Sequence, residues 1–173
     1  MKKNLVLTGM MGVGKSTIGR KLARKLSFRF IDIDKLIEDH EGCKIYQIFK
    51  NKSENYFRNL ESKITLHELN KNNLVISLGG GAFLNNSIRK SVKNKATSFW
   101  LDVTSSILTK RLKKTKKRPL LIGKNLSETI NKIYLERKKT YSEADFKIKC
   151  DSLNPETITN KIIKLYKNAE NKV

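Results

Sequence analysis

The chain has 173 residues and a formal net charge of +21, because 37 lysines and arginines outnumber 16 aspartates and glutamates. This length favours one domain, and no apolar run approaches the roughly 18 residues that a membrane span needs. Cys43 and Cys150 are far apart in the chain, which excludes a disulfide scaffold and predicts a reducing compartment, the cytoplasm. An apolar stretch starts almost at the first residue, so we expect no signal peptide and no membrane partner.

The basic excess raises the question of nucleic-acid binding. Most of the excess is lysine, and the basic residues are scattered along helical stretches, apart from the run Lys113-Lys114-Thr115-Lys116-Lys117-Arg118. A solvated basic surface explains this distribution better than a dedicated nucleic-acid site, and the same field would steer small anions. We therefore expect no nucleic-acid partner.

The apolar residues predict strands that alternate with helices along the chain. Strands are expected at 5–8, 28–33, 74–78, 98–101 and 145–149, and helices at 15–26, up to 38, within 45–69, between the later strands and at the C-terminus. This alternation indicates an α/β fold in which helices cover both faces of a parallel sheet. No repeat or linker interrupts the pattern, so residues 1–173 are expected to form a single domain.

A phosphate-binding loop follows the first predicted strand. The segment from Gly9 to Thr17, GMMGVGKST, fits the pattern GxxxxGK[ST] and precedes an amphipathic helix. Its glycines let backbone N–H groups surround a phosphate, and the helix N-terminus adds its positive dipole end. Lys15 can reach the β- and γ-phosphates, and the Ser16 hydroxyl can bind Mg²⁺. The predicted ATP-binding residues of the loop are Gly12, Val13, Gly14, Lys15, Ser16 and Thr17.

Five further motifs follow the loop. They are Phe30-Ile31-Asp32-Ile33-Asp34, Phe57-Arg58-x-x-Glu61, Val75-Ile76-Ser77-Leu78-Gly79-Gly80-Gly81, Arg118-Pro119-Leu120-Leu121 and Glu136-Arg137-x-x-x-Tyr141. The two carboxylates at i and i+2 share one side of an extended chain, and the glycines follow a strand, where doubly wound sheets bind ligands. In this order and spacing, the motifs resemble those of the shikimate kinases, from about Leu5 to Pro155.

The resemblance implies transfer of the γ-phosphoryl group of ATP to the 3-hydroxyl of shikimate, a step of aromatic amino acid biosynthesis. It also implies a three-layer αβα P-loop kinase fold with a five-stranded parallel sheet of order 2-3-1-4-5. A substrate-binding helical region is expected at about 34–61 and a lid at about 112–124. Mg²⁺ is the expected cofactor, ATP the co-substrate, and the protein is expected to be a monomer.

The two aspartates of the second motif receive different roles from this resemblance. Asp34 is expected to accept hydrogen bonds from the substrate hydroxyls and to orient the attacking one. Asp32 is expected to hold Mg²⁺ through a water molecule, because Mg²⁺ gives up its water shell reluctantly. The alternative is that Asp34 only caps the following helix. Together with Lys15 and Arg118, these aspartates form the predicted catalytic set.

Arg58 and Arg137 match the two arginines with which the family binds the substrate carboxylate. A guanidinium suits this task because its forked donors can bind a carboxylate through two hydrogen bonds. Glu61 lies three residues after Arg58 on a predicted helix and can hold that side chain in place.

The remaining substrate-site predictions concern glycines and aromatic residues. Gly79, Gly80 and Gly81 would let the backbone approach the substrate closely, and Gly80 matches the family's substrate-contacting position. Phe49 and Phe57 have two open interpretations, as walls of the substrate pocket or as ordinary core residues at helical spacing.

The outer part of the nucleotide site is assigned by resemblance alone. Arg118 would close onto the ATP phosphates from the lid, Arg111 would stack on adenine, and Asn154 and Pro155 would close over the base. Two alternatives remain open at this point. One is a P-loop kinase for gluconate or a nucleotide, and the other is a basic nucleic-acid-binding protein that retains an ATP loop.

Overall fold

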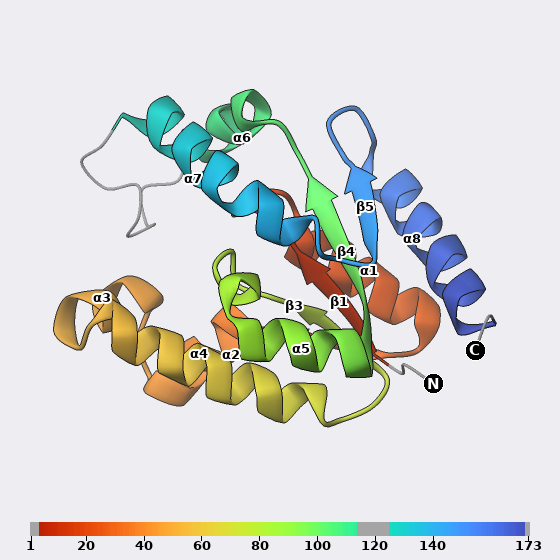
Figure 1. Ribbon diagram of the computed structural model, residues 1–173, viewed down its shortest axis with the longest axis horizontal. Helices are drawn as coiled ribbons and strands as arrows, with labels where there is room; N and C mark the ends of the chain where they lie inside the picture. The colour runs from red at the N-terminus through yellow and green to blue at the C-terminus, as the bar shows by residue number, and fades with distance from the viewer. Residues whose placement is uncertain (1–3, 114–124, 172–173) are drawn as a thin grey trace.

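The computed structural model describes residues 4–113 and 125–171, which form a three-layer αβα sandwich (Figure 1). Five parallel strands lie in the order β2-β3-β1-β4-β5, which confirms the predicted sheet. The strands are β1 (Asn4–Thr8), β2 (Arg29–Asp32), β3 (Leu74–Ser77), β4 (Ala96–Asp102) and β5 (Phe146–Lys149).

Helices cover both faces of this sheet (Figure 1). The helices are α1 (Lys15–Leu26), α2 (Ile33–Glu41), α3 (Ile45–Asn51), α4 (Glu54–Leu69), α5 (Asn86–Lys95), α6 (Ser105–Leu112), α7 (Leu126–Tyr141) and α8 (Pro155–Glu170), with a short 3₁₀ helix, η1 (Ala82–Leu84). α1 and α8 pack together on one face, and α5 and α7 lie over the other. No helix of the described residues has the length and apolar character that a membrane crossing requires.

The central strands form the core because both of their faces are covered. β1 and β3 are buried along their whole length, and β4 is buried up to Leu101. A parallel sheet of this kind requires nearly continuous apolar strands, which is the pattern that made these strands recognisable in the sequence.

Several element boundaries differ by a few residues from the sequence-based expectation. β2 ends at Asp32, and Ile33 already belongs to α2. Within the expected helical stretch 45–69 the chain forms two helices, because the Ser53 hydroxyl accepts a hydrogen bond from Tyr56 N (3.1 Å) and caps a new helix. Each cap fixes the start of a helix, Asp32 that of α2 and Ser53 that of α4.

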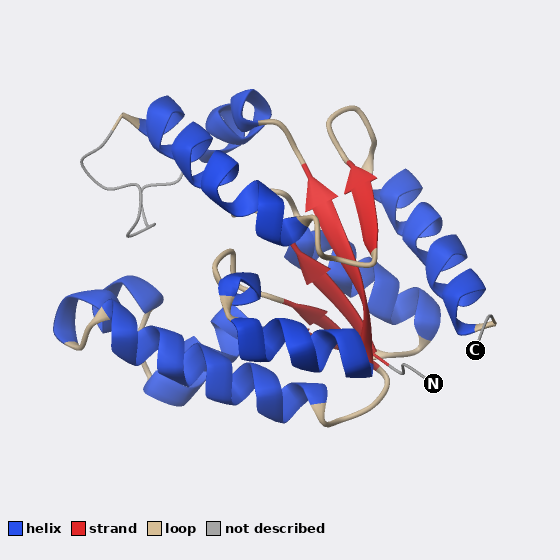
Figure 2. Cartoon of the chain, in the orientation of Figure 1, coloured by secondary structure: helices blue, strands red, loops and turns tan. Residues whose placement is uncertain are grey.

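The sheet order places the functional loops together. β1 lies between β3 and β4, so the loops that follow β1 and β3 leave the same edge of the sheet at the point where the strand order reverses. Open α/β sheets bind ligands at this position. α2, α3 and α4 contact one another at one end of the molecule (Figure 2), and they contain the predicted substrate-binding region at 34–61. Apart from residues 112 and 113, the predicted lid lies outside the described residues.

Candidate active site

The phosphate loop connects β1 to α1 through a backbone that requires glycine. Gly9, Gly12 and Gly14 have φ values of 131°, 79° and 100°, which are left-handed conformations that L side chains rarely adopt. At Gly9 a Cβ atom would also lie 2.5 Å from the carbonyl oxygen of Leu101. Gly14 is the N-cap of α1 and supplies no capping side chain, so the start of α1 can present backbone N–H groups to an anion.

The lysine of the loop folds back over the loop backbone. Lys15 Nζ donates hydrogen bonds to the carbonyl oxygens of Gly9 (2.8 Å) and Met10 (3.0 Å). These bonds hold a positive charge at the mouth of the loop, where the phosphates of a nucleotide would be expected to bind.

A cavity of about 230 Å³ brings the phosphate loop and both aspartates together. Of the predicted site residues it is lined by Gly12, Gly14, Lys15, Ser16, Thr17, Asp32, Asp34 and Gly80. Met11, Ser77 and Leu78 also line it, although sequence reasoning gave them no role. Val13 is instead a buried core residue, only 4% exposed.

Asp32 connects the phosphate loop to α2. Its Oδ2 accepts a hydrogen bond from the Ser16 hydroxyl (2.5 Å), and its Oδ1 accepts one from Lys35 N (3.4 Å), which makes Asp32 the N-cap of α2. The alternative that Asp34 caps this helix is therefore wrong. Asp34 lies in the first turn of α2 and faces the cavity.

Arg58 is held by two glutamates of its own helix, α4. Its Nη1 donates to Glu61 Oε2 (2.7 Å), and its Nε and Nη2 donate to Glu54 Oε1 (3.3 and 3.2 Å). The guanidinium carbon lies 5.0 Å from the centre of the Phe57 ring. Phe57 is 3% exposed and its ring contacts that of Phe49 at a tilt of 47°. Neither ring lines the cavity, so Phe57 supports Arg58 from the core.

The glycine turn after β3 lies against the charged groups of the site. A Cβ atom at Gly79 would overlap Asp34 Oδ1 (2.6 Å) and Glu61 Oε1, and one at Gly81 would lie 2.6 Å from Arg58 Nη1. Glu61 is 2% exposed, and burial raises its pKa against the opposing effect of Arg58. Because these glycines have no side chain, the carboxylates of Asp34 and Glu61 and the guanidinium of Arg58 can lie against the turn.

Arg137 and Tyr141 both bind the carbonyl oxygen of Gly80. Arg137 Nη1 donates to this oxygen over 2.7 Å, and the Tyr141 hydroxyl donates to the same atom. Sequence reasoning noted Tyr141 as part of a motif but gave it no role. The spacing i and i+4 places it on the same face of α7 as Arg137, and this signal could have identified it.

The outer nucleotide residues are only partly assembled near the loop. Arg111, on α6, donates to the carbonyl oxygen of Val13 at 3.5 Å. Asn154 Oδ1 accepts a hydrogen bond from Thr157 N (2.9 Å), and Pro155 is the first residue of α8, so both residues start this helix. Arg118 lies outside the described residues.

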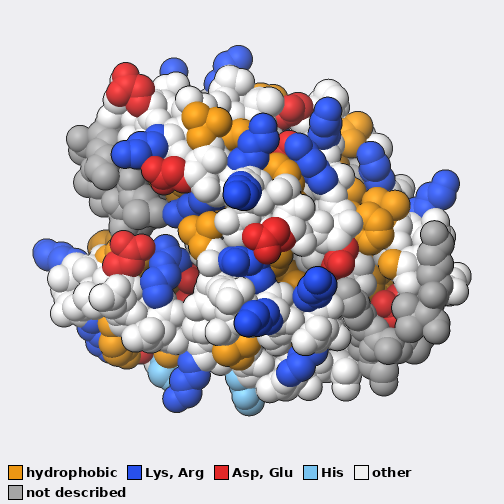
Figure 3. All heavy atoms as spheres, viewed as in Figure 1, with side chains coloured by type: hydrophobic (Ala, Val, Ile, Leu, Met, Phe, Trp, Pro, Cys, Tyr) orange, Lys and Arg blue, Asp and Glu red, His pale blue; other side chains and the backbone are white. Residues whose placement is uncertain are grey.

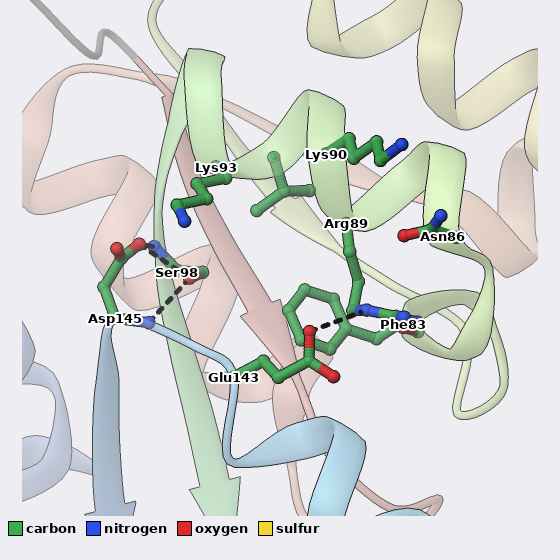
Figure 4. Close-up of a pocket in the computed structure, with 9 residues that line it drawn as sticks. Phe83, Asn86, Arg89, Lys90, Lys93, Ser98, Glu143 and Asp145 are labelled. Atoms are coloured by element: carbon green, nitrogen blue, oxygen red, sulfur yellow. Dashed lines mark hydrogen bonds and ion pairs between the residues drawn. The ribbon is translucent and has the colours of Figure 1, made fainter.

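A second cavity of about 330 Å³ lies between α5 and the turn that follows α7 (Figure 4). Arg89 and Glu143 point towards one another across it, with Nε and Oε2 3.0 Å apart, and Arg89 Nη1 also donates to the carbonyl oxygens of Phe83 and Leu84. These bonds connect η1, α5 and the turn. The phosphate loop and the aspartates lie at the smaller cavity, which is therefore the candidate active site.

Comparisons with known proteins identify the family of the chain. A family model described as shikimate kinase matches residues 11–167. The shikimate kinase of Persephonella marina is 43% identical over 161 residues, covering 93% of this chain and 97% of its own. The shikimate kinase from Acinetobacter baumannii in complex with shikimate superposes with a TM-score of 0.93 at 29% identity, covering 100% of this chain and 96% of its own.

A more distant structure shares the fold alone. A gluconokinase from Sinorhizobium meliloti superposes with a TM-score of 0.57 at 14% identity, covering 98% of this chain and 97% of its own. The family model and the relatives above are far more similar to this chain, and they decide between the alternatives that the sequence left open. The chain belongs to the shikimate kinase family.

Proposed function

We propose that the protein transfers the γ-phosphoryl group of ATP to the 3-hydroxyl of shikimate, giving 3-phosphoshikimate and ADP. The observation that carries the proposal is the single cavity that contains Lys15 and Ser16 of the phosphate loop together with Asp34 and Gly80. Phosphoryl transfer depends mainly on placing donor and acceptor in line and on neutralising charge, and this arrangement serves both needs.

The phosphate loop is proposed to bind the ATP phosphates. Backbone N–H groups at the start of α1 and the ammonium group of Lys15 lie in the same region, so together they would balance the charge of the β- and γ-phosphates. On binding, Lys15 would exchange its bonds to the carbonyl oxygens of Gly9 and Met10 for bonds to phosphate oxygens. Arg118 remains a proposed lid residue that adds charge from the other side.

The acceptor is proposed to bind between Asp34 and the two arginines. Asp34 would accept hydrogen bonds from hydroxyl groups and orient the attacking oxygen towards the phosphate loop. Arg58 and Arg137 approach the glycine turn from α4 and α7. They would bind the carboxylate at the opposite end of the ring, so the substrate would be aligned by its two ends.

The residues at the cavity fit a magnesium ion as the cofactor. The Ser16 hydroxyl and the Asp32 carboxylate lie 2.5 Å apart at its edge and offer hard oxygen atoms. Mg²⁺ is usually held by one or two protein oxygens, substrate phosphates and water, so these two side chains are enough for the protein's share of its ligands. When bound, the ion neutralises phosphate charge.

The surface charge enters the proposal only as a general field. On the face shown in Figure 3, Lys and Arg side chains are spread over several elements, with acidic side chains between them. This mixture of charges favours small-molecule substrates over a nucleic-acid partner. The proposal also includes a cytoplasmic monomer without a membrane partner. Sedimentation equilibrium and a nucleic-acid titration at moderate salt would test these predictions.

A coupled ADP-release assay tests the proposed function. Shikimate, gluconate and nucleoside monophosphates are compared as acceptors with MgATP, and the product is identified by mass spectrometry. Of these acceptors, we expect only shikimate to be turned over. The Lys15→Ala variant should lose this turnover. The Lys90→Ala variant, which alters an exposed lysine of the second cavity, should keep it unchanged. Turnover with shikimate no greater than background would contradict the proposal.

A further inference from the structure

We propose that Tyr141 is a positioning residue that fixes the Gly80 peptide and the Arg137 guanidinium relative to one another, and thereby sets the selectivity of the site for a carboxylate-bearing acceptor. The inference rests on the proposed function and deepens it. It assigns a role to a residue that is separated from the cavity by the groups it holds.

Tyr141 and Arg137 share one hydrogen-bond acceptor atom. The Tyr141 hydroxyl and Arg137 Nη1 both donate to the carbonyl oxygen of Gly80. A carbonyl oxygen has two lone pairs, so these two donors use its capacity fully. The Gly80–Gly81 peptide is therefore held from the α7 side, and its orientation towards the cavity is fixed because the peptide unit is planar.

Tyr141 is itself held rigidly by its surroundings. Its side chain is fully buried, its ring lies 5.9 Å from that of Trp100 on β4, and its hydroxyl lies 3.9 Å from the Sδ atom of Met10. Burial raises the pKa of Tyr141, so the phenol keeps its proton at neutral pH and acts as a donor. Tyr141 thus links α7, the phosphate loop and the glycine turn.

Arg137 keeps hydrogen-bond donors that can bind the substrate. Arg137 uses Nη1 to donate a hydrogen bond to the Gly80 carbonyl oxygen. Its other guanidinium N–H groups can then donate to a substrate carboxylate. A two-bond contact with a carboxylate requires the guanidinium to hold one orientation. The phenol fixes the shared acceptor, and with it the position from which Arg137 approaches the substrate. A neutral acceptor would gain little from that orientation, and this difference is the proposed source of selectivity.

Tyr141→Phe tests the proposal because it removes a single oxygen atom. We expect KM for shikimate to rise about tenfold, which corresponds to about 1.4 kcal/mol. We expect kcat and KM for ATP to change by less than about twofold, because the phosphate-loop groups and Asp34, on which these constants depend, do not bind the Gly80 carbonyl. The preference for shikimate over its methyl ester, measured as a ratio of kcat/KM values, should fall by a similar factor. Calorimetric titration with shikimate should show the same loss of affinity.

Tyr134→Phe is the matched control. This residue lies on the same helix and donates to Asp102 Oδ1 at 2.9 Å, away from the glycine turn. Its loss should leave KM for shikimate and the ester ratio unchanged. If Tyr141→Phe lowers the melting temperature but leaves both quantities as in the wild type, the residue is only structural and the proposal fails. Equal rises in KM for shikimate and ATP would also overturn it.

A double-mutant cycle keeps the test independent of overall stability. If Tyr141 acts through Arg137, Tyr141→Phe should change the ester ratio little in an Arg137→Lys background. Additive effects would overturn the proposed coupling. The experiments also distinguish a failure of the proposed function from a failure of the role of Tyr141. A wild-type protein that does not phosphorylate shikimate contradicts the proposed function, whereas an active wild type with an unaltered ester ratio in Tyr141→Phe contradicts only the role of Tyr141.

Discussion

The Gly79→Ala substitution tests whether the site depends on two carboxylates meeting the glycine turn. The added methyl group would lie 2.6 Å from Asp34 Oδ1 and would also overlap Glu61 Oε1. Ordinary contact of a Cβ atom begins near 3.4 Å, so Asp34 must retreat by most of an ångström. The φ of Gly79 lies outside the left-handed region, so the cost is steric rather than conformational.

The expected magnitude follows from that displacement. A misplacement of about 1 Å in a catalytic arrangement can cost about 100-fold in rate, or about 2.7 kcal/mol in transition-state free energy. We therefore expect kcat/KM for shikimate to fall by about two orders of magnitude. Overpacking beside the buried Glu61 should also cost about 1–3 kcal/mol of stability, and the melting temperature should fall by about 3–10 °C.

Steady-state kinetics and thermal melts of Gly79→Ala and Gly80→Ala would check this reasoning. At Gly80 the nearest atom to an added methyl group is Met11 N at 3.4 Å, which is an ordinary contact, so this variant should keep the wild-type melting temperature. The steric argument would be refuted if Gly79→Ala kept kcat/KM within about threefold of the wild type, or if both variants melted at the same reduced temperature.

Three further predictions concern an arginine of the site, a structural arginine and the two cysteines. Arg58→Lys loses the forked bonds to its glutamates, so KM for shikimate should rise on the order of 10- to 100-fold with KM for ATP unchanged, and equal changes would contradict the assignment. Arg89→Ala removes bonds to η1 and the turn, so thermal melts should show a fall of about 4–8 °C, whereas Lys90→Ala should melt like the wild type. Burial raises the pKa of the Cys150 thiol to about 11, so a disulfide reagent at pH 8 should modify Cys43 first, and Cys150 only after denaturation; equal rates would be inconsistent with this burial.

Much of the fold could be predicted because the strands of a parallel sheet are apolar throughout. β1 and β3 are covered on both faces and stand out as short apolar runs. Boundaries set by a single hydrogen bond were harder to predict. Ile33 continues the apolar pattern of β2, yet the Asp32 side chain caps a helix there, and Ser53 divides the following helical stretch in the same way.

The site was predictable where chemistry limits the choice of residue. The phosphate loop needs glycine for its φ values and lysine for its charge, so its sequence identifies it. Tyr141 donates to a carbonyl oxygen 61 residues away, which only the folded chain brings near. Phe57 directly precedes Arg58 in the sequence, but only the structure shows that its ring is buried with the Arg58 guanidinium carbon 5.0 Å from its centre. Hydrophobic periodicity cannot separate such a residue from ordinary core.

The two arginines of the proposed substrate site have different electrostatic surroundings, of which the sequence indicates only the Glu61 partner of Arg58. Arg58 carries two glutamate partners, so its charge is largely balanced before any substrate binds. For Arg137, no carboxylate of the described residues lies within the 4.0 Å of an ion pair, and its hydrogen-bond acceptor is the neutral Gly80 carbonyl. In the proposed function, a substrate carboxylate would therefore gain more from Arg137, which is 9% exposed and only weakly screened by solvent. Within a chain of net charge +21, the neutral carbonyl partner is what leaves this cation available to the substrate.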